Sequence, residues 1–218
     1  MPSRERKKDG GIPSGVVTRL PIYLRYLTEL QDQGVGRVSS AQLGEALSFT
    51  AAQIRSDLSY FGSFGQQGYG YDVDELLRQI SRILGLNRNY VMVLVGAGNL
   101  GKALASYENF RRRGFEIRAI FDVDELLVGN YHACCVIQPV EQLEEYLRSN
   151  PTDIGIIATP GHVSQEICDT FVKCGVPSIW NFSPVHLQVP DEVLVEHIHL
   201  TDSLLRLSFR LNEQRQKA

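Results

Sequence analysis

The sequence predicts an α/β protein in which a small helical domain precedes a parallel sheet with helices on both faces. Two observations lead to this prediction. From residue 89 onward, apolar runs alternate with amphipathic helical patterns, which is typical of a doubly wound parallel sheet. Before residue 86, three short helical patterns are followed by a segment rich in glycines and aromatic residues, which is typical of a helix-turn-helix with a hairpin.

The composition is that of an ordinary globular chain. Its 218 residues, 43% hydrophobic and 22% charged, suffice for two small domains or one large one. The net charge of −3 argues against a protein that coats nucleic acid without selectivity. Residues 1–85 hold ten Lys/Arg and nine Asp/Glu, and the remainder holds twelve and sixteen. The excess of acidic residues therefore lies in the second part.

The sequence predicts no membrane span, secretion signal or metal site. No apolar run reaches the roughly twenty residues that cross a bilayer, and the start lacks the apolar core of a signal peptide. We therefore expect a cytoplasmic protein. The four cysteines and five histidines do not have the spacing of metal ligands. We interpret the cysteines as reduced, partly buried thiols, and a thiol switch is the alternative.

The first expected helix follows a polar arm, residues 1–15, that we predict to be mobile. Leu20, Leu24, Leu27 and Leu30 are spaced by three or four residues, which places them on one face of an amphipathic helix. These leucines are the expected core of the first domain.

Two shorter helices are expected next. Ser39 and Ser40 form a start signal for a helix with Leu43, Ala46 and Leu47 on one side.

Thr50 is expected to cap the third helix, residues 51–60, which would bury Ile54 and Leu58. Glycines and aromatic residues then alternate over residues 61–71, which predicts a hairpin or wing.

The third helix and the wing are the candidate DNA-binding surface. The helix has the size and polarity to enter a major groove, and Arg55 is suited to contact guanine or phosphate. Tyr69 or Tyr71 in the wing is suited to approach the phosphates or the minor groove. A helical dimerisation cap is the alternative for this domain. The candidate DNA contacts are Ser39, Ser40, Thr50, Gln53, Arg55, Ser56, Ser59, Tyr60, Gly68 and Tyr69.

The second part of the chain alternates between strand and helix patterns. The expected strands are 90–95, 115–121, 154–159, 177–182 and 193–199. The expected helices, including one that links the two parts, are 72–86, 99–111, 139–148, 162–174 and 201–211. The last helix has apolar residues on more than one face, so it needs more than one surface to cover it.

A glycine turn directly after the first strand predicts a dinucleotide site. Gly96, Gly98 and Gly101 form the pattern G-x-G-x-x-G, which allows a tight turn, close approach of a pyrophosphate and close packing of the next helix. Asp122, about twenty residues later, is placed to bind ribose hydroxyls and to repel a 2′-phosphate. This favours NAD(H) over NADP(H), and coenzyme A is the alternative ligand.

The carboxyl ends of the later strands are the expected position of the nicotinamide, because ligands of such sheets lie at that edge. Residues 158–161 and 181–184 end two of these strands. The candidate cofactor-binding residues are Gly96, Ala97, Gly98, Asn99, Leu100, Gly101, Asp122, Val123, Tyr107, Thr159, Pro160, Asn181 and Phe182.

Taken together, the motifs resemble those of the Rex family of redox-sensing transcriptional repressors. A Ser-Tyr-Phe-Gly segment at the start of the wing, joined in one chain to a dinucleotide fingerprint, is far more specific to this family than either motif alone. The likeness covers nearly the whole chain. The segments that carry it are 19–27, 37–44, 53–62, 68–73, 95–101, 121–124, 181–184 and 204–209.

The resemblance implies a homodimer of winged-helix and Rossmann-like domains that binds inverted-repeat operator DNA. It implies that NADH releases the repressor from its operator and that NAD+ permits or favours DNA binding. It also implies a C-terminal helix swapped between subunits. The expected division is residues 1–85 for DNA binding, 86–199 for NAD(H) binding and 200–218 for the swapped helix.

The resemblance further implies a relay between the domains, made by an arginine, a tyrosine and a carboxylate. Arg25 and Tyr107 match the first two positions, but His199 occupies the third, with Asp202 three residues on. This departure puts the carboxylate step in doubt, and a histidine would make it pH-dependent. At Ser56, where relatives usually carry a second basic residue, operator affinity or preference is expected to differ.

Two other functions fit parts of the pattern. An NAD-dependent oxidoreductase would need an acid or base near the nicotinamide, and His162 and His186 are the available candidates. A ligand-binding module that contacts a protein partner would need no DNA surface.

Overall fold

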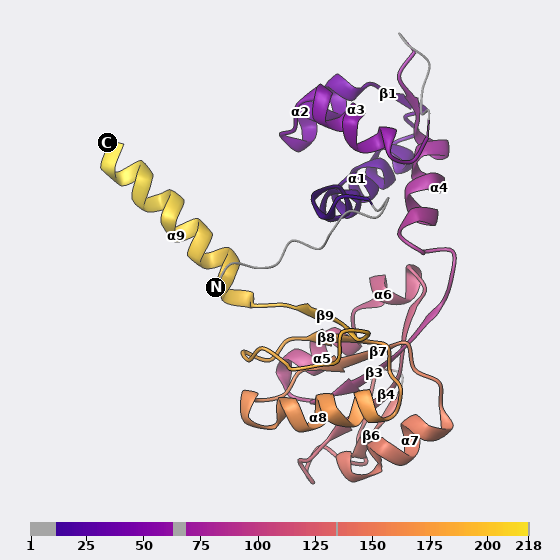
Figure 1. Ribbon diagram of the computed structural model, residues 1–218, viewed down its shortest axis with the longest axis vertical. Coiled ribbons are helices and arrows are strands. Elements are labelled where there is room, and N and C mark those ends of the chain that lie inside the picture. Colours follow the sequence, from indigo (N-terminus) through magenta and orange to yellow (C-terminus); the bar gives the residue numbers. More distant parts are fainter. Residues whose placement is uncertain (1–11, 63–68, 134, 218) are drawn as a thin grey trace. The chain divides into compact units, whose positions relative to one another are not determined.

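The computed structural model describes residues 12–62, 69–133 and 135–217, and it divides the chain into two units (Figure 1). The first comprises Met1–Asn87 and the second Arg88–Ala218. Within the described residues, no helix is long and apolar enough to cross a membrane.

The first unit is a small helical domain with a two-stranded sheet. Val38 of β1 pairs antiparallel with Tyr71 of β2, which brings the segment before the second helix beside the segment after the wing. Residues 63–68, most of the expected wing, lie outside the described residues. The elements are α1 (Ser14–Asp32), β1 (Arg37–Val38), α2 (Ser40–Leu47), α3 (Ala51–Ser59), β2 (Tyr71–Asp72) and α4 (Val73–Ile83).

The core of this unit contains the apolar faces that the sequence predicts. The four leucines of α1 and both Ile54 and Leu58 of α3 are buried, which confirms the predicted faces. Two expectations are wrong in detail. Ala46 is exposed on α2, because the short helix turns only Leu43 and Leu47 inward. Helix α1 begins at Ser14, so residues 14 and 15, expected in the N-terminal arm, belong to this helix. Residues 1–11 lie outside the described part.

Side-chain caps fix where α2 and α3 begin. The Ser39 hydroxyl accepts the backbone N–H of Gln42, whose side chain accepts the Ser39 N–H in return. The Thr50 hydroxyl accepts the backbone N–H of Gln53. The Thr50 cap ends the short turn between α2 and α3.

The second unit is a doubly wound sheet. Its strands are β3 (Tyr90–Val95), β4 (Phe115–Asp122), β5 (Tyr131–His132), β6 (Cys135–Pro139), β7 (Ile154–Ile157), β8 (Ser178–Asn181) and β9 (Leu194–His197). Its helices are α5 (Asn99–Ala105), α6 (Glu108–Arg112), a short 3-10 helix (Val140–Gln142), α7 (Leu143–Ser149), α8 (Gly161–Lys173) and α9 (Leu200–Lys217).

The strand order is β5-β6-β4-β3-β7-β8-β9, and every neighbouring pair is parallel except β5 with β6. The chain moves outward from β3 through β4 to β6, then returns past β3 to β7 and continues to β9. This is the Rossmann order, with its switch point between β3 and β7, and ligands of such sheets bind at the carboxyl ends of the strands beside it.

Alternate residues of β3 serve two cores. Val93 and Val95 pack with residues of α7 and α8 on one face, whereas Met92 and Leu94 pack with residues of α5 and α6 on the other. A strand buried on both faces needs a continuous apolar run, and the sequence supplies one from residue 90 to 95.

The predicted secondary structure differs from the observed one at two places. The expected helix 99–111 is broken into α5 and α6, and Tyr107 lies at the break as the N-cap of α6. Strands β5 and β6 were not predicted, and β6 ends where a helix was expected to begin.

Helix α9 has no buried residue. Its apolar side chains, which are 46–65% exposed, are Leu200, Leu204, Leu205, Leu207, Phe209 and Leu211.

Candidate functional site

The turn between β3 and α5 uses each of its three glycines for a different geometric reason. Gly96 has a φ of +103°, and a Cβ there would lie 2.5 Å from the carbonyl oxygen of Ala158. A Cβ on Gly101 would lie 1.8 Å from the Gly96 carbonyl oxygen, so α5 packs directly on the turn. At Gly98, by contrast, nothing in the described part of the chain lies within 4 Å of where a Cβ would be. The middle glycine is therefore open to a closely approaching ligand.

Asp122, the last residue of β4, is held against this turn by the backbone. Its Oδ2 accepts the N–H of Ala97 and its Oδ1 accepts the N–H of Asp124. Each carboxylate oxygen keeps further acceptor capacity. The carboxylate is thus fixed beside the turn and can still accept hydrogen bonds from a ligand.

A cavity of about 650 Å³ opens beside the turn, within the size range of small-molecule and cofactor sites. The structure brings together around it six of the sequence-predicted residues: Gly96, Gly98, Asp122, Val123, Thr159 and Pro160. These residues come from the ends of β3, β4 and β7.

The start of α5 lies next to this cavity. Gly98 is its N-cap and supplies no capping side chain, Asn99 is exposed and Leu100 is half-buried. Backbone N–H groups at such a position bind phosphate oxygens. Ala97 is buried, and its contribution is the N–H that holds Asp122.

Asn181 shapes the turn after β8. Its Oδ1 accepts the N–H and hydroxyl of Ser183 at 3.0 and 2.7 Å, and its Nδ2 donates to the Val185 carbonyl at 2.9 Å. The same Nδ2 lies 3.0 Å from Nδ1 of His197. Because Asn181 is fully buried, its side chain fixes the turn rather than presenting polar atoms at the surface.

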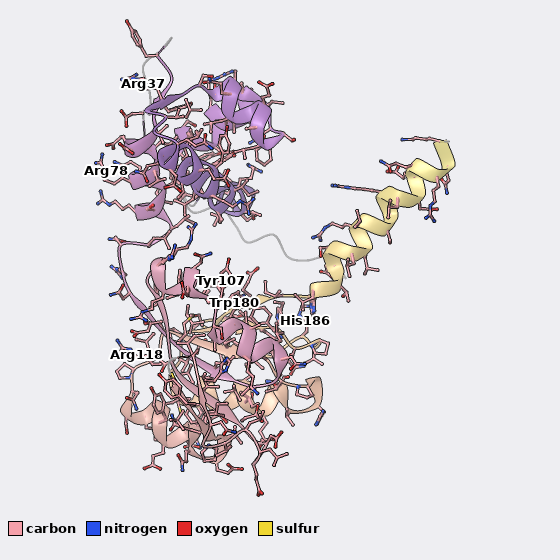
Figure 2. The ribbon with its side chains drawn as sticks, turned by 180° about the vertical axis from the view of Figure 1, so that it is seen from behind. Arg37, Arg78, Tyr107, Arg118, Trp180 and His186 are labelled. Carbon is pink, nitrogen blue, oxygen red and sulfur yellow. The ribbon has the colours of Figure 1, made fainter. Side chains whose placement is uncertain are left out.

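A row of aromatic rings joins this turn to Tyr107. Ring centroids are 4.6 Å apart for Phe182 and Trp180, 5.4 Å for Trp180 and Phe110, and 4.8 Å for Phe110 and Tyr107. Figure 2 labels Tyr107 and Trp180 in this region. Tyr107 is 52% exposed and does not line the cavity beside the glycine turn. Phe110 and Trp180 are not among the predicted site residues, because no sequence pattern indicates that these two distant residues are in contact.

The three residues expected to form the relay are found in two units. His199 is half-buried in the second unit, 6.2 Å from His197 and 6.0 Å from His186 between ring centroids. Arg25 is exposed on α1 of the first unit.

In the first unit, the exposed Arg55 of α3 contacts the half-buried Ser40 of α2. The Arg55 guanidinium donates to the Ser40 hydroxyl at 3.1 Å. Ser56, Ser59 and Tyr60 are also exposed. A polar surface therefore spans both helices of the helix-turn-helix.

The wing is described only in part. Tyr69 is 69% exposed and its carbonyl accepts from Arg37 at 3.3 Å. Gly68, another candidate DNA contact, lies outside the described residues.

A buried carboxylate, Asp57, links α3 to α1. Both oxygens of Asp57 accept from the Arg19 guanidinium, at 2.6 and 2.8 Å, and the Tyr23 hydroxyl donates to Oδ2 at 2.6 Å. Gln53 also donates to Asp57, at 2.7 Å. Gln53 is a candidate DNA contact, but its amide is held by Asp57, about one turn further along α3. Asp57 is not among the predicted site residues, because its partners on α1, Arg19 and Tyr23, are 38 and 34 residues away.

The surroundings of Asp57 lower its pKa below the usual value of 3.8. Burial alone would raise it, but the hydrogen bonds from Arg19, Tyr23 and Gln53 outweigh that effect. The charged pair also raises the pKa of Arg19, whereas burial is the main cause of the raised pKa of Tyr23. The carboxylate is therefore ionised at neutral pH.

The histidines considered for an oxidoreductase lie apart. His162 is exposed and lines the cavity beside the glycine turn, whereas His186 belongs to the group with His197 and His199. Among the described residues, no set of three or more histidine, cysteine or acidic side chains is arranged to hold a metal ion.

Two family models match parts of the chain. Residues 11–59 match the family described as "Putative DNA-binding protein N-terminus", and residues 87–185 match the "CoA binding domain" family. The matches fall on the helix-turn-helix and on the parallel sheet.

Curated relatives match nearly the whole chain. The redox-sensing transcriptional repressor Rex of Clostridium kluyveri is 50% identical over 96% of this chain and 99% of its own. That of Thermoanaerobacter sp. is 45% identical over 93% of this chain and 91% of its own.

Solved structures of a Rex-family repressor, RSP, match equally broadly. RSP with β-NADH has a TM-score of 0.88 and 42% identity, covering 94% of this chain and 96% of its own. RSP with β-NAD+ and operator DNA has a TM-score of 0.89 and 45% identity, covering 94% and 95%.

Proposed function

We propose that this chain, which belongs to the Rex family of redox-sensing transcriptional repressors, is a DNA-binding repressor that senses the ratio of NADH to NAD+. NADH binding in the second unit releases the protein from its operator, while NAD+ permits or favours operator binding. The observation that carries this proposal is the open glycine turn with Asp122 held against it, in one chain with a helix-turn-helix.

The residues at the glycine turn fit a nicotinamide dinucleotide. The open face of Gly98 admits a pyrophosphate, and the Asp122 carboxylate accepts hydrogen bonds from ribose hydroxyls. Thr159 and Pro160, which line the same cavity, are proposed to lie near the nicotinamide.

Coenzyme A is the second candidate ligand, because a family named for coenzyme A matches residues 87–185. A carboxylate aimed at the ribose would repel the ribose phosphate of coenzyme A as it would repel that of NADP(H). RSP, a relative of known structure, was crystallised with β-NADH and with β-NAD+. Both arguments favour the dinucleotide.

We assign DNA reading to the exposed surface of α2 and α3. Arg55 contacts guanine or phosphate, with Ser56, Ser59 and Tyr60 beside it. The caps Ser39 and Thr50 direct the helix starts toward the phosphates. Ser40 and, in the wing, Gly68 and Tyr69 complete the proposed contacts, whereas the amide of Gln53 is held by Asp57.

The active form is proposed to be a homodimer on an inverted-repeat operator. Six apolar side chains of α9 are exposed on a single helix, and a second subunit provides the surfaces to cover them. We propose that α9 is swapped, and that Arg25, Tyr107 and His199 connect the units. A regulator of this kind acts in the cytoplasm, where DNA and the nicotinamide pool meet.

An oxidoreductase is not favoured, because the close relatives are named transcriptional repressors. Steady turnover of NADH with a small carbonyl compound would support that alternative. His162 and His186 would then be the candidates for the acid or base.

The experiment is a DNA-binding titration on an AT-rich inverted repeat, with NADH and NAD+ added in turn. We expect NADH to lower the operator affinity and NAD+ to maintain or raise it. Coenzyme A and NADPH serve as competitors in the same assay. Operator binding that is indifferent to the oxidation state of the nicotinamide would contradict the proposal.

A further inference from the structure

Three histidines gather in the second unit where β9 leads into α9. The centroid of His197, at the end of β9, is 4.4 Å from that of His186 and 6.2 Å from that of His199. The His197 ring is also hydrogen-bonded, through Nδ1, to the side chain of the buried Asn181 of β8.

The hydrogen bonds around Asn181 determine the protonation state of His197. The Ser183 N–H can only donate, so the atom that accepts it is the Asn181 amide oxygen, and the other terminal atom is the NH2 group. One hydrogen of this group goes to the Val185 carbonyl and the other points at Nδ1 of His197. Nδ1 must therefore be an unprotonated acceptor, and His197 is neutral with its proton on Nε2.

We propose that the neutral imidazole of His197 is a positioning group for residues 181–185, and that protonation of His197 weakens NADH binding. The inference rests on the proposed function, because it concerns the same cavity. A protonated Nδ1 would present an N–H to the N–H of Asn181 and would break the contact between β9 and the turn.

The turn reaches the cavity through Gly161, the first residue of α8. A Cβ on Gly161 would lie 2.8 Å from a methyl group of Val185 and 3.5 Å from Pro184, so the turn packs closely on this residue. Thr159 and Pro160, directly before Gly161, line the cavity. A shift of the turn therefore moves the wall of the proposed nicotinamide site.

Titratable groups surround His197 from each neighbouring segment. His186 lies on the segment after β8, Glu196 is the adjacent residue of β9, and His199 precedes α9. Burial, then the neighbouring His186 and His199, lower the pKa of His197 below 6.5, while Glu196 acts in the opposite direction. A lowered pKa keeps His197 neutral at pH 7, and the neutral form is lost as the pH falls through that value.

The measurement is NADH affinity from pH 8 to the lowest pH at which the chain stays folded, read within minutes of mixing. Trp180 is the single tryptophan of the chain and adjoins Asn181, so energy transfer from it to the reduced nicotinamide reports binding. Between the pKa of His197 in the free protein and its lower pKa in the NADH complex, the Kd of the wild type should rise by up to about tenfold per pH unit, as expected for one linked proton. Far-UV circular dichroism at each pH checks that the chain stays folded.

Two variants separate titration from loss of structure. In His197→Asn the amide oxygen takes the place of Nδ1 as acceptor and does not titrate, so the Kd should stay flat with pH. His186→Asn removes the neighbouring imidazole that lowers the pKa of His197. That pKa should therefore rise, and NADH affinity should begin to fall at a higher pH. His132→Asn, on β5 outside the cluster, should keep the wild-type profile.

A wild-type Kd that stays constant through the pH range in which the His197 ring titrates, as followed by NMR of its ring protons, would overturn the inference while leaving the proposed function intact. An acid loss of the wild-type kind in a folded His197→Asn would overturn it as well. Failure of NADH to bind even at pH 8 would instead overturn the proposed function and the inference with it.

Discussion

The buried carboxylate of Asp57 connects α3, the proposed recognition helix, to the rest of its domain. Its side chain is 1% exposed, and it accepts hydrogen bonds from Arg19, Tyr23 and Gln53. A buried carboxylate is tolerated only when its lone pairs are satisfied in this way. The orientation of α3, and with it of Arg55, therefore depends on a residue that does not reach the surface.

Asp57→Ala should lower the free energy of unfolding of the first unit by about 3 kcal/mol, because it leaves a partly buried guanidinium without its partner. Urea unfolding at pH 7 measures this, with the exposed Asp32→Ala as the matched control. The pKa of Asp57 is lowered from 3.8, so its stabilisation is present above that pH and is lost as the pH falls through the lowered value. Equal stability of the two variants at pH 7 would contradict this account.

Arg55→Ala should abolish operator binding while NADH affinity persists. A side-chain contact to a base is worth about 1–3 kcal/mol, and a dimer loses it twice. Electrophoretic mobility shifts measure the effect. The control of equal charge is Arg78→Ala, at an exposed arginine of α4 (labelled in Figure 2) that pairs with Glu75. A similar loss in both variants would assign the effect to net charge.

Asp122→Ala should weaken NADH binding and reduce discrimination against NADPH, while operator binding without nucleotide survives. Hydrogen bonds to a charged group contribute about 1.5–3 kcal/mol, which corresponds to about 10–100-fold in Kd. Titration with both nucleotides measures it, with the exposed Asp191→Ala as control. If Asp122→Ala and Arg55→Ala each damaged both activities equally, the division of labour between the units would be wrong.

At the scale of elements, the sequence predicts what local patterns determine. The leucines of α1 and the continuous apolar run of β3 have periods that identify helix and buried strand. Strand β5 has two residues, too few for a period, and its existence depends on pairing with β6. The break at Tyr107 involves no glycine or proline. Arg19 and Tyr23 lie 38 and 34 residues from Asp57, so that network leaves no local pattern either.

Helix α9 is the element whose exposed apolar side chains require a partner. Leu205→Glu with Phe209→Glu should convert a dimer to a monomer, because it places charges on side chains that are 65% and 64% exposed in the single chain and would be buried in the dimer. Light scattering after size-exclusion chromatography measures the mass. Gln214→Glu, near the end of the same helix, should leave the dimer intact, and a dimer that survives the double substitution would exclude α9 from the interface.

At the scale of the whole molecule, sensing requires that NADH bind the two functional states with different affinity. A hundredfold preference supplies about 2.7 kcal/mol per site, and two sites in a dimer supply about twice that. Such a difference is large enough to move a repressor from mostly bound to mostly free. Tight binding without that difference would shift nothing.

Linkage makes this argument testable without knowledge of the route between the units. If NADH lowers operator affinity by a given factor, saturating operator must lower NADH affinity by the same factor, because both describe one thermodynamic cycle. We expect equal factors when the Kd of NADH is measured with and without operator and the Kd of operator with and without NADH. NAD+ in the same cycle should give a factor near one or of opposite sense. Unequal factors for NADH would mean that a further equilibrium, such as dissociation of the dimer, takes part in the switch.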